Sequence, residues 1–291
     1  MDERPFYKYY KDEQSEKTAS KIFVRFICFA IVIYAVLFGI NYYFNANYTY
    51  ITINGISMQP TLNPDPYLLV KTVNGIRKSD YVQDGVYIRE TQDIDYNDII
   101  IIANIFADKT IIKRALAFDG DYITIARIET DDGQNEYRFM RVKENTSTVE
   151  VVEEEYIKSY QVWSNAYTVS QSQRPQDPST AEIVYEPLFF NSFYNKGYES
   201  RLFSVHEADG EQVRFFKVPD GQFFYMGDNR TNSTDGREKG TTKVDNIVGK
   251  VVKIVSNGTD YPGNNFWWLN RLGGLISVLW DDILRFFGAN I

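Results

Sequence analysis

The segment NGISMQPTL places a serine where its hydroxyl could act as a nucleophile. Ser57 follows a run of β-forming residues, with Gly55 before it and Pro60 after it. Glycine permits a tight bend and proline fixes the exit of the chain, so we expect Ser57 on a sharp turn. Turn serines without a catalytic role are common, and a nucleophilic role needs a base from another part of the chain.

The segment TIIKRALA could supply that base. On a β-strand Lys113, Ala115 and Ala117 share one face, with Ile112 and Arg114 as the neighbours of the lysine. Burial disfavours the charged form of a lysine, and the nearby Arg114 cation would lower its pKa further. A neutral amine can take the proton of a serine hydroxyl. The alternative is an exposed lysine that protects an edge strand from aggregation.

A third segment, GDNRTNSTDGR, concentrates small polar residues and opposite charges between Gly227 and Arg237. It follows a turn and a short aromatic strand. Asp235 can pair with Arg237, two residues further on, or with Arg114 of the lysine segment. The alternative is a solvated loop.

The rare residue types limit the chemistry. The chain has one histidine, His206, and one cysteine, Cys28, which excludes a histidine-rich metal site and an intrachain disulfide. A Ser–His–Asp triad would have to use His206, which lies in a polar stretch outside the three segments. The net charge of −8 argues against nucleic acid as a partner, because phosphate binding needs a basic face. We expect no metal and no cofactor.

An apolar run near the N-terminus predicts a transmembrane anchor. Phe26 to Phe44 carries no charged side chain and is about 28 Å long as a helix, close to one hydrocarbon core. A cleaved signal peptide is disfavoured because the run is long and no A-x-A site follows, and a buried core helix because every face is apolar. Lysines and arginines precede the run and none follows before Lys71. The positive-inside rule then puts residues 1–25 in the cytoplasm and the rest outside, and the charged and polar residues 1–21 predict a short flexible tail.

Short β-rich runs separated by turn signals predict a mostly β fold after the anchor. No long amphipathic helix is expected between residues 50 and 260. The clearest predicted strands are Tyr50–Ile53, Tyr67–Thr72, Asp98–Ile105 and Thr110–Ala117.

Two further regions have a different character. Residues 127–222 hold an acidic cluster (150–155), a polar loop (170–182) and aromatic strands (183–190 and 212–218). They predict a β-rich insertion that could form a second small domain, with no catalytic constellation in it. In residues 261–291 apolar side chains recur at three- to four-residue spacing, which predicts an amphipathic helix. It would lie in the membrane interface or pack on the β body, and both interpretations stay open.

These segments, which occur together and in this order along the chain, resemble the conserved boxes of the bacterial type I signal peptidases. Residues 54–62 resemble the box around the serine nucleophile of that family, and residues 96–100 the short box before an apolar strand. Residues 111–123 resemble the lysine box and residues 218–237 the last box. The resemblance covers the anchor and these boxes, and does not extend to the insertion or the C-terminal region. It implies a signal-peptidase-like all-β catalytic body on one N-terminal transmembrane helix, to which the residue pattern adds a β-rich insertion and a C-terminal amphipathic helix.

The resemblance also implies roles for single residues. Ser57 would be the nucleophile, with its backbone N–H donating into the oxyanion hole, and Lys113 the general base. Ser233 would hold the lysine amine by a hydrogen bond. Asp235 would support the site through Arg237 and Arg114. The side chains that would line shallow apolar pockets for small substrate side chains are Ile53 and Ile112.

The chain departs from the family pattern near both catalytic candidates. Gly55 stands where many relatives have a serine, so a hydroxyl donor to the oxyanion is missing; one such donor is worth about 3 kcal/mol. Another backbone N–H or a water must then compensate. The other departures affect efficiency and pocket shape and leave the Ser–Lys pair unchanged: Asn97, Ala117, Asp119 and Gly236.

The resemblance implies a membrane-bound serine endopeptidase that removes signal peptides from exported pre-proteins, cutting after a small residue with another small residue two positions earlier. Its partners would be pre-proteins and the lipid bilayer. The alternatives are an inactive membrane-tethered homologue acting as a binding module and, less favoured because of the anchor, a self-cleaving repressor with a serine–lysine site. The expected organisation is a cytoplasmic tail (1–25), an anchor (26–44), a catalytic β domain (45–126 and 223–260), the insertion (127–222) and a C-terminal amphipathic segment (261–291).

Overall fold

The structure is a computed structural model of the chain. It divides into two compact units, Met1–Ala46 and Asn47–Ile291, which are described separately. The backbone is described for residues 4–72, 78–83, 86–91, 94–106, 109–129, 135–157, 198, 202–208, 211–230, 232–257 and 267–286.

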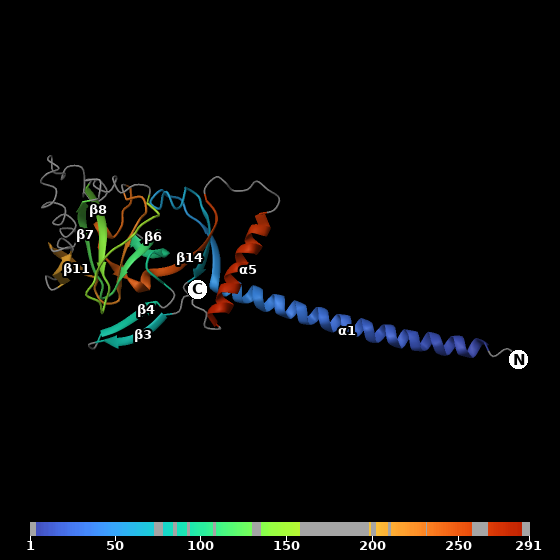
Figure 1. Cartoon of the computed structure of the whole chain (residues 1–291). Helices are drawn as coiled ribbons and strands as arrows, with labels where there is room; N and C mark the ends of the chain where they lie inside the picture. Colours follow the sequence, from blue (N-terminus) through green and yellow to red (C-terminus); the bar gives the residue numbers. More distant parts are fainter. Residues whose placement is uncertain are drawn as a thin grey trace. The chain divides into compact units, whose positions relative to one another are not determined.

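The first unit is one long helix, α1 (Arg4–Asn47) (Figure 1). The prediction of a flexible tail before the apolar run is therefore wrong, because the backbone is helical from Arg4 onward. Pro5 lies in the first turn, where its missing N–H has no intrahelical partner to lose, and the following lysines, glutamates and alanine are good helix formers.

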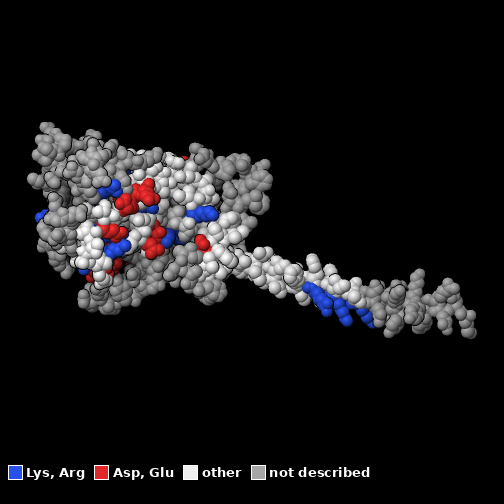
Figure 2. Space-filling model, in the orientation of Figure 1, with Lys and Arg blue, Asp and Glu red and all other residues white. Residues whose placement is uncertain are grey.

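The part of α1 from Lys17 to Asn47 is the one helix among the described residues that is long and apolar enough to cross a membrane. Its large apolar side chains between residues 22 and 43 are mostly exposed. Figure 2 shows basic side chains on the N-terminal part of this stretch and uncharged atoms along the remainder. These basic residues are Lys17, Lys21 and Arg25.

The second unit is built on a seven-stranded antiparallel sheet, which gives the mostly β fold that the sequence predicts (Figure 1). The neighbouring strands follow the order β1-β2-β14-β5-β6-β12-β13. Their bounds are Tyr48–Thr52 (β1), Tyr67–Thr72 (β2), Ile247–Ser256 (β14), Ile99–Phe106 (β5), Lys109–Phe118 (β6), Gln222–Met226 (β12) and Thr242–Lys243 (β13).

A five-stranded sheet and a hairpin complete the β structure. The sheet has the order β10-β11-β7-β8-β9, and β3 pairs with β4 in the hairpin. Strand β7 crosses the expected boundary at residue 127, and the segments 170–182 and 183–190 lie outside the described residues. The bounds are Phe203–Ala208 (β10), Glu211–Lys217 (β11), Tyr122–Glu129 (β7), Asn135–Val142 (β8), Val149–Val151 (β9), Lys78–Gln83 (β3) and Val86–Thr91 (β4).

The main core lies where the two large sheets share apolar side chains. Leu116 and Phe224 of the first sheet pack with Ile125, Phe139 and Phe216 of the second, and all five are at most 3% exposed. The rings of Phe139 and Phe224 stack with centroids 5.7 Å apart. Burial of each such side chain contributes roughly 1.5–3 kcal/mol, so the second sheet is a structural part of the same unit.

Three short or terminal helices complete the unit. The one-turn helix α4 (Gly236–Lys239) follows the third polar segment, and the 3-10 helix η5 (Val244–Asn246) precedes β14. The C-terminal helix α5 (Trp267–Phe286) confirms the helix predicted there. Within the described part of residues 50–260 no longer helix interrupts the strands.

Candidate active site

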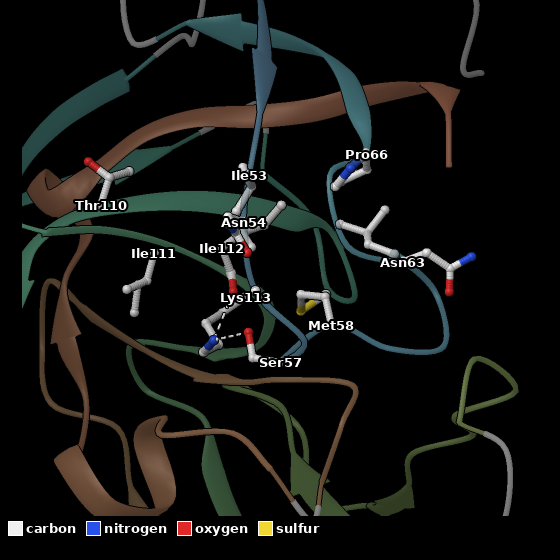
Figure 3. Close-up of a pocket in the computed structure, with 12 residues that line it drawn as sticks. Ile53, Asn54, Ser57, Met58, Asn63, Pro66, Thr110, Ile111, Ile112 and Lys113 are labelled. Atoms are coloured by element: carbon white, nitrogen blue, oxygen red, sulfur yellow. Dashed lines mark hydrogen bonds between the residues drawn. The ribbon is translucent and has the colours of Figure 1, made fainter. Parts of the chain in front are cut away.

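Ser57 and Lys113 meet where the turn after β1 lies against strand β6. Ser57 lies in the turn that follows β1, and Lys113 lies on β6, opposite Ile100 of β5. The lysine Nζ donates a hydrogen bond to Ser57 Oγ across 2.6 Å. Figure 3 shows the two side chains pointing toward each other from these two elements. The arrangement allows direct proton transfer between the hydroxyl and the amine.

The lysine amine lies in surroundings that favour its neutral form. Lys113 is 4% exposed, and its Nζ also donates to the backbone oxygen of Ile112 at 3.0 Å. Burial lowers the pKa of Lys113 to about 8, while Asp235 acts in the opposite direction and Arg237 lowers it further. The cation that assists is thus Arg237 and not, as the sequence suggested, Arg114, because successive side chains of a strand point to opposite faces.

A pocket opens beside the pair, between the turn after β1 and strand β6 (Figure 3). Ile53 and Ile112, the two predicted pocket residues, both line it. Its full lining is Ile53, Asn54, Gly55, Ser57, Met58, Leu62, Asn63, Pro66, Thr110, Ile111, Ile112 and Lys113.

The segment after β12 holds the serine turn by its backbone. Asn229 donates its N–H to the Ser57 carbonyl oxygen at 3.0 Å and its side-chain amide to the Ile56 carbonyl oxygen, also at 3.0 Å. Gly227 lies close to the serine turn: a Cβ at this position would be 2.4 Å from the Ser57 backbone carbonyl oxygen and 2.2 Å from Ser233 Oγ. A glycine is therefore needed at position 227 for close approach of the two segments.

Asp228 ties the serine turn to the lysine strand from behind the site. Its carboxylate accepts hydrogen bonds from Arg114 Nε at 2.9 Å, from Arg114 Nη2 at 2.6 Å and from Thr61 Oγ1 at 2.5 Å. Arg114 Nη1 also donates to the Asn97 carbonyl oxygen at 2.6 Å. Arg114 pairs with Asp228 and not with Asp235, and this bidentate pair fixes β6 relative to the turn.

Asp235 and Arg237 form the other predicted ion pair. The Asp235 carboxylate accepts from Arg237 Nε at 2.8 Å and from the Gly227 N–H at 2.9 Å, and it caps α4 through the Arg237 N–H. Burial alone would raise the pKa of Asp235, but the Arg237 guanidinium and the Gly227 N–H hold it below its usual value. The carboxylate therefore stays charged close to Lys113.

Ser233 lies beside this pair without the predicted bond to the lysine. Its Oγ is buried and makes no hydrogen bond of normal geometry to any described residue, but its contact with the Asp235 carboxylate helps to lower the pKa of that group. The hydrogen bonds described for the amine run to Ser57 and to the Ile112 carbonyl oxygen. The role of Ser233 stays a prediction.

Two further carboxylates, one from the lysine box and one from the short box, fix the end of β6 and the start of β5. Asp121, at the turn between β6 and β7, accepts the N–H groups of Phe118 and Glu144, both at 2.9 Å, and the Tyr96 hydroxyl. Asp98, ahead of β5, pairs with Lys250 of β14 at 2.6 Å. These carboxylates hold turns and strand starts and lie outside the pocket.

Comparison with known proteins decides the family. The family described as "Signal peptidase, peptidase S26" matches residues 21–256. The chain belongs to the signal peptidase family. It is a serine endopeptidase of the class that removes signal peptides, as the sequence predicted.

The chain is also similar to individual proteins. A signal peptidase I of Aquifex aeolicus is 29% identical over 238 residues, covering 78% of this chain and 82% of the relative. A signal peptidase I of Helicobacter pylori is 46% identical over 43 residues, 15% of each chain. A crystal structure of a signal peptidase I from Enterococcus faecalis V583 matches 55% of this chain and 97% of its own, with 15% identity and a TM-score of 0.27.

Two residues of the region predicted as an insertion reach the back of the candidate site, which sequence reasoning missed. Glu154 has a fully buried side chain and pairs with the buried Arg230, whose Nε donates to the Gly227 carbonyl oxygen at 2.9 Å. Tyr156 donates its hydroxyl to Glu154 at 2.6 Å and stacks its ring on the Arg114 guanidinium, 3.7 Å away. The acidic cluster was the one visible signal, and it did not distinguish Glu154 from its neighbours.

His206 is not brought into this arrangement. It lies on β10, paired with Val213 of β11 in the five-stranded sheet, whereas the hydrogen bond described for Ser57 Oγ comes from Lys113. Among the described residues no group of three His, Cys, Asp or Glu side chains could hold a metal ion.

Proposed function

We propose that the peptidase cuts with Ser57 as its nucleophile and Lys113 as its general base. The observation that carries this proposal is the 2.6 Å contact between Ser57 Oγ and a buried amine whose pKa is lowered to about 8. A neutral Lys113 takes the hydroxyl proton while Ser57 Oγ attacks the scissile carbonyl carbon. The resulting ammonium returns the proton to the leaving amine, which departs and leaves an acyl ester on Ser57.

Deacylation uses the same lysine a second time. A water molecule gives its proton to neutral Lys113 and attacks the ester, and the ammonium then protonates Ser57 Oγ as the acid product leaves. The Ser57 N–H stabilises the oxyanion in both halves of the reaction. With Gly55 in place of a serine, no side-chain hydroxyl from that position adds to it.

The pocket supports a preference for small substrate side chains. An extended substrate would lie between the segment around Ile53 and the strand around Ile112, which line the pocket from two elements. The branched side chains of these isoleucines leave shallow space, suited to small residues at the cleavage position and two positions earlier.

The anchor would place this site at the outer face of the membrane. The span from Lys17 to Asn47 supports a single crossing. Lys17, Lys21 and Arg25 lie toward its N-terminal end, and by the positive-inside rule that end is cytoplasmic. The partners would then be the lipid bilayer and pre-proteins that emerge through it.

Cleavage of a precursor with a small-x-small site, in detergent, tests the proposal. Wild type should cut once at that site, while Ser57→Ala and Lys113→Ala should be inactive although folded. Lys243→Ala is the matched control, because Lys243 is exposed on β13. Normal cutting by Lys113→Ala would exclude the lysine mechanism, and an inactive wild type would favour the binding-module alternative.

A further inference from the structure

Helix α5 lies outside the part of the chain that matches the family. The match ends at residue 256, and α5 runs from Trp267 to Phe286. The helix contacts β14, beside which it lies in Figure 1, and Val278 on its inner face is 7% exposed. One side of α5 therefore packs on the β body, which was one of the two interpretations that the sequence left open.

The inner face of α5 is held by polar contacts. Lys253 of β14 donates a hydrogen bond to Ser277 Oγ at 3.2 Å. Asp282 accepts a hydrogen bond from the Tyr48 hydroxyl and lies 3.8 Å from Lys71 Nζ. These contacts to β14, β1 and β2 fix which side of the helix faces outward.

The outward side carries an apolar stripe, which consists of Ile276, Trp280 and Ile283. The three side chains are 59%, 60% and 41% exposed. Spacings of four and three residues put them on one face of a helix, about opposite Val278. A helix packed on a water-facing body normally turns its apolar side inward, whereas α5 also carries three large apolar side chains on its outward side.

The contact between Tyr48 and Asp282 holds α5 close in space to the end of the candidate span. Tyr48, which binds Asp282, directly follows Asn47, the last residue of the candidate span. Because of that contact α5 is held beside the residue at which the chain would leave the bilayer. Tryptophan is enriched at the boundary between headgroups and acyl chains.

We propose that α5 lies in the interface of the same bilayer, with the stripe of Ile276, Trp280 and Ile283 inserted among the lipids. The inference rests on the anchor in the proposed function. It gives the catalytic unit a second membrane attachment, carried by the chain beyond the family match. The occupant of the stripe is lipid, and neither a second copy of the chain nor another protein.

Spin labels on the full-length protein in phosphatidylcholine vesicles test this directly. Cys28 is the single cysteine, so Cys28→Ser gives a cysteine-free background for Ile276→Cys and Ile283→Cys. Asp281→Cys is the matched control, because Asp281 is exposed on the same helix but off the stripe. Labels at 276 and 283 should collide with oxygen, which concentrates in lipid, several-fold more often relative to a water-soluble nickel chelate than the label at 281.

Two results would overturn the inference. Equal ratios at the three positions, with ready access to the nickel chelate, would put the stripe in water. Loss of access to both reagents, or dipolar broadening between labels, would show that protein or a second copy covers it.

The same samples separate this inference from the proposed function. Cleavage of a soluble peptide reports the active site, and extraction with alkaline carbonate reports the anchor. Labels in lipid on an inactive protein would refute the catalytic proposal and leave the inference intact. Labels in water on an active, carbonate-resistant protein would refute the inference alone.

Discussion

The Lys113 amine lies 2.6 Å from the Ser57 hydroxyl oxygen, although the two residues come from different elements. Hydrogen bonds made by two neighbouring residues, Asn229 and Asp228, hold the serine turn and the lysine strand in place for this contact. Asn229 holds the backbone of the serine turn, and Asp228 joins Thr61 of that turn to Arg114 beside the lysine.

Glu154→Gln should destabilise the protein, because it removes the partner of the buried Arg230 charge. Loss of one member of a buried ion pair costs about 3–5 kcal/mol. The free energy of unfolding, from urea denaturation of the detergent-solubilised chain, measures it. Glu153→Gln is the matched control, since Glu153 is 76% exposed, and it should change stability by less than about 0.5 kcal/mol. Equal small effects of both variants would show that Glu154 is not needed.

Gly227→Ala should impair catalysis without unfolding the protein. A Cβ at this position would press on the Ser57 carbonyl oxygen, at 2.4 Å, and must displace the serine turn. A shift of about 1 Å in a reacting group can lower the rate about 100-fold, and kcat should fall by that order. Gly273→Ala provides the comparison, because a Cβ there has no neighbour within 4 Å. Similar kcat values for both variants would contradict the close contact.

Ile53→Ala should relax the preference for small substrate side chains. Shortening this side chain enlarges the pocket, so precursors with leucine in place of alanine near the cleavage site should be cut better. The ratio of kcat/KM for leucine over alanine substrates should rise about 10-fold or more, the usual worth of a few methylene groups. Ile254→Ala is the control, as Ile254 is exposed on β14 and does not line the pocket. An unchanged ratio for Ile53→Ala would remove Ile53 from the specificity pocket.

The resemblance to the signal peptidase boxes singled out Ser57 and Lys113, since each segment alone fits a turn serine or an edge-strand lysine equally well; their catalytic roles stay a prediction. The alternation along β6 puts Lys113 and its small neighbours on one face, and the predicted strand 67–72 agrees with β2. The ion-pair partners of the buried arginines were harder to predict from the sequence. The sequence offered Arg237 or Arg114 as the partner of Asp235, and tertiary packing pairs Asp235 with Arg237 and Arg114 with Asp228. Glu154 was missed because its partner lies 76 residues away and no periodicity links them.

The helix ends show the same limit. The apolar run predicted the span, but α1 continues to Arg4 because good helix formers extend a helix that already exists. The amphipathic pattern predicted α5, yet it did not reveal which side faces the body. Asp282 decides that through Tyr48 and Lys71, which lie more than 200 residues earlier in the chain.

The pH dependence of kcat/KM tests the central claim most directly. Lys113 must be neutral to accept the Ser57 proton, and burial lowers its pKa to about 8. Below that pH the amine is protonated, so kcat/KM should fall about tenfold for each unit of decreasing pH and level off above it. A soluble peptide without titrating groups between pH 5 and 9 is the substrate. A limb with its midpoint near 8 would support the lysine base, whereas a flat profile across that range would contradict it.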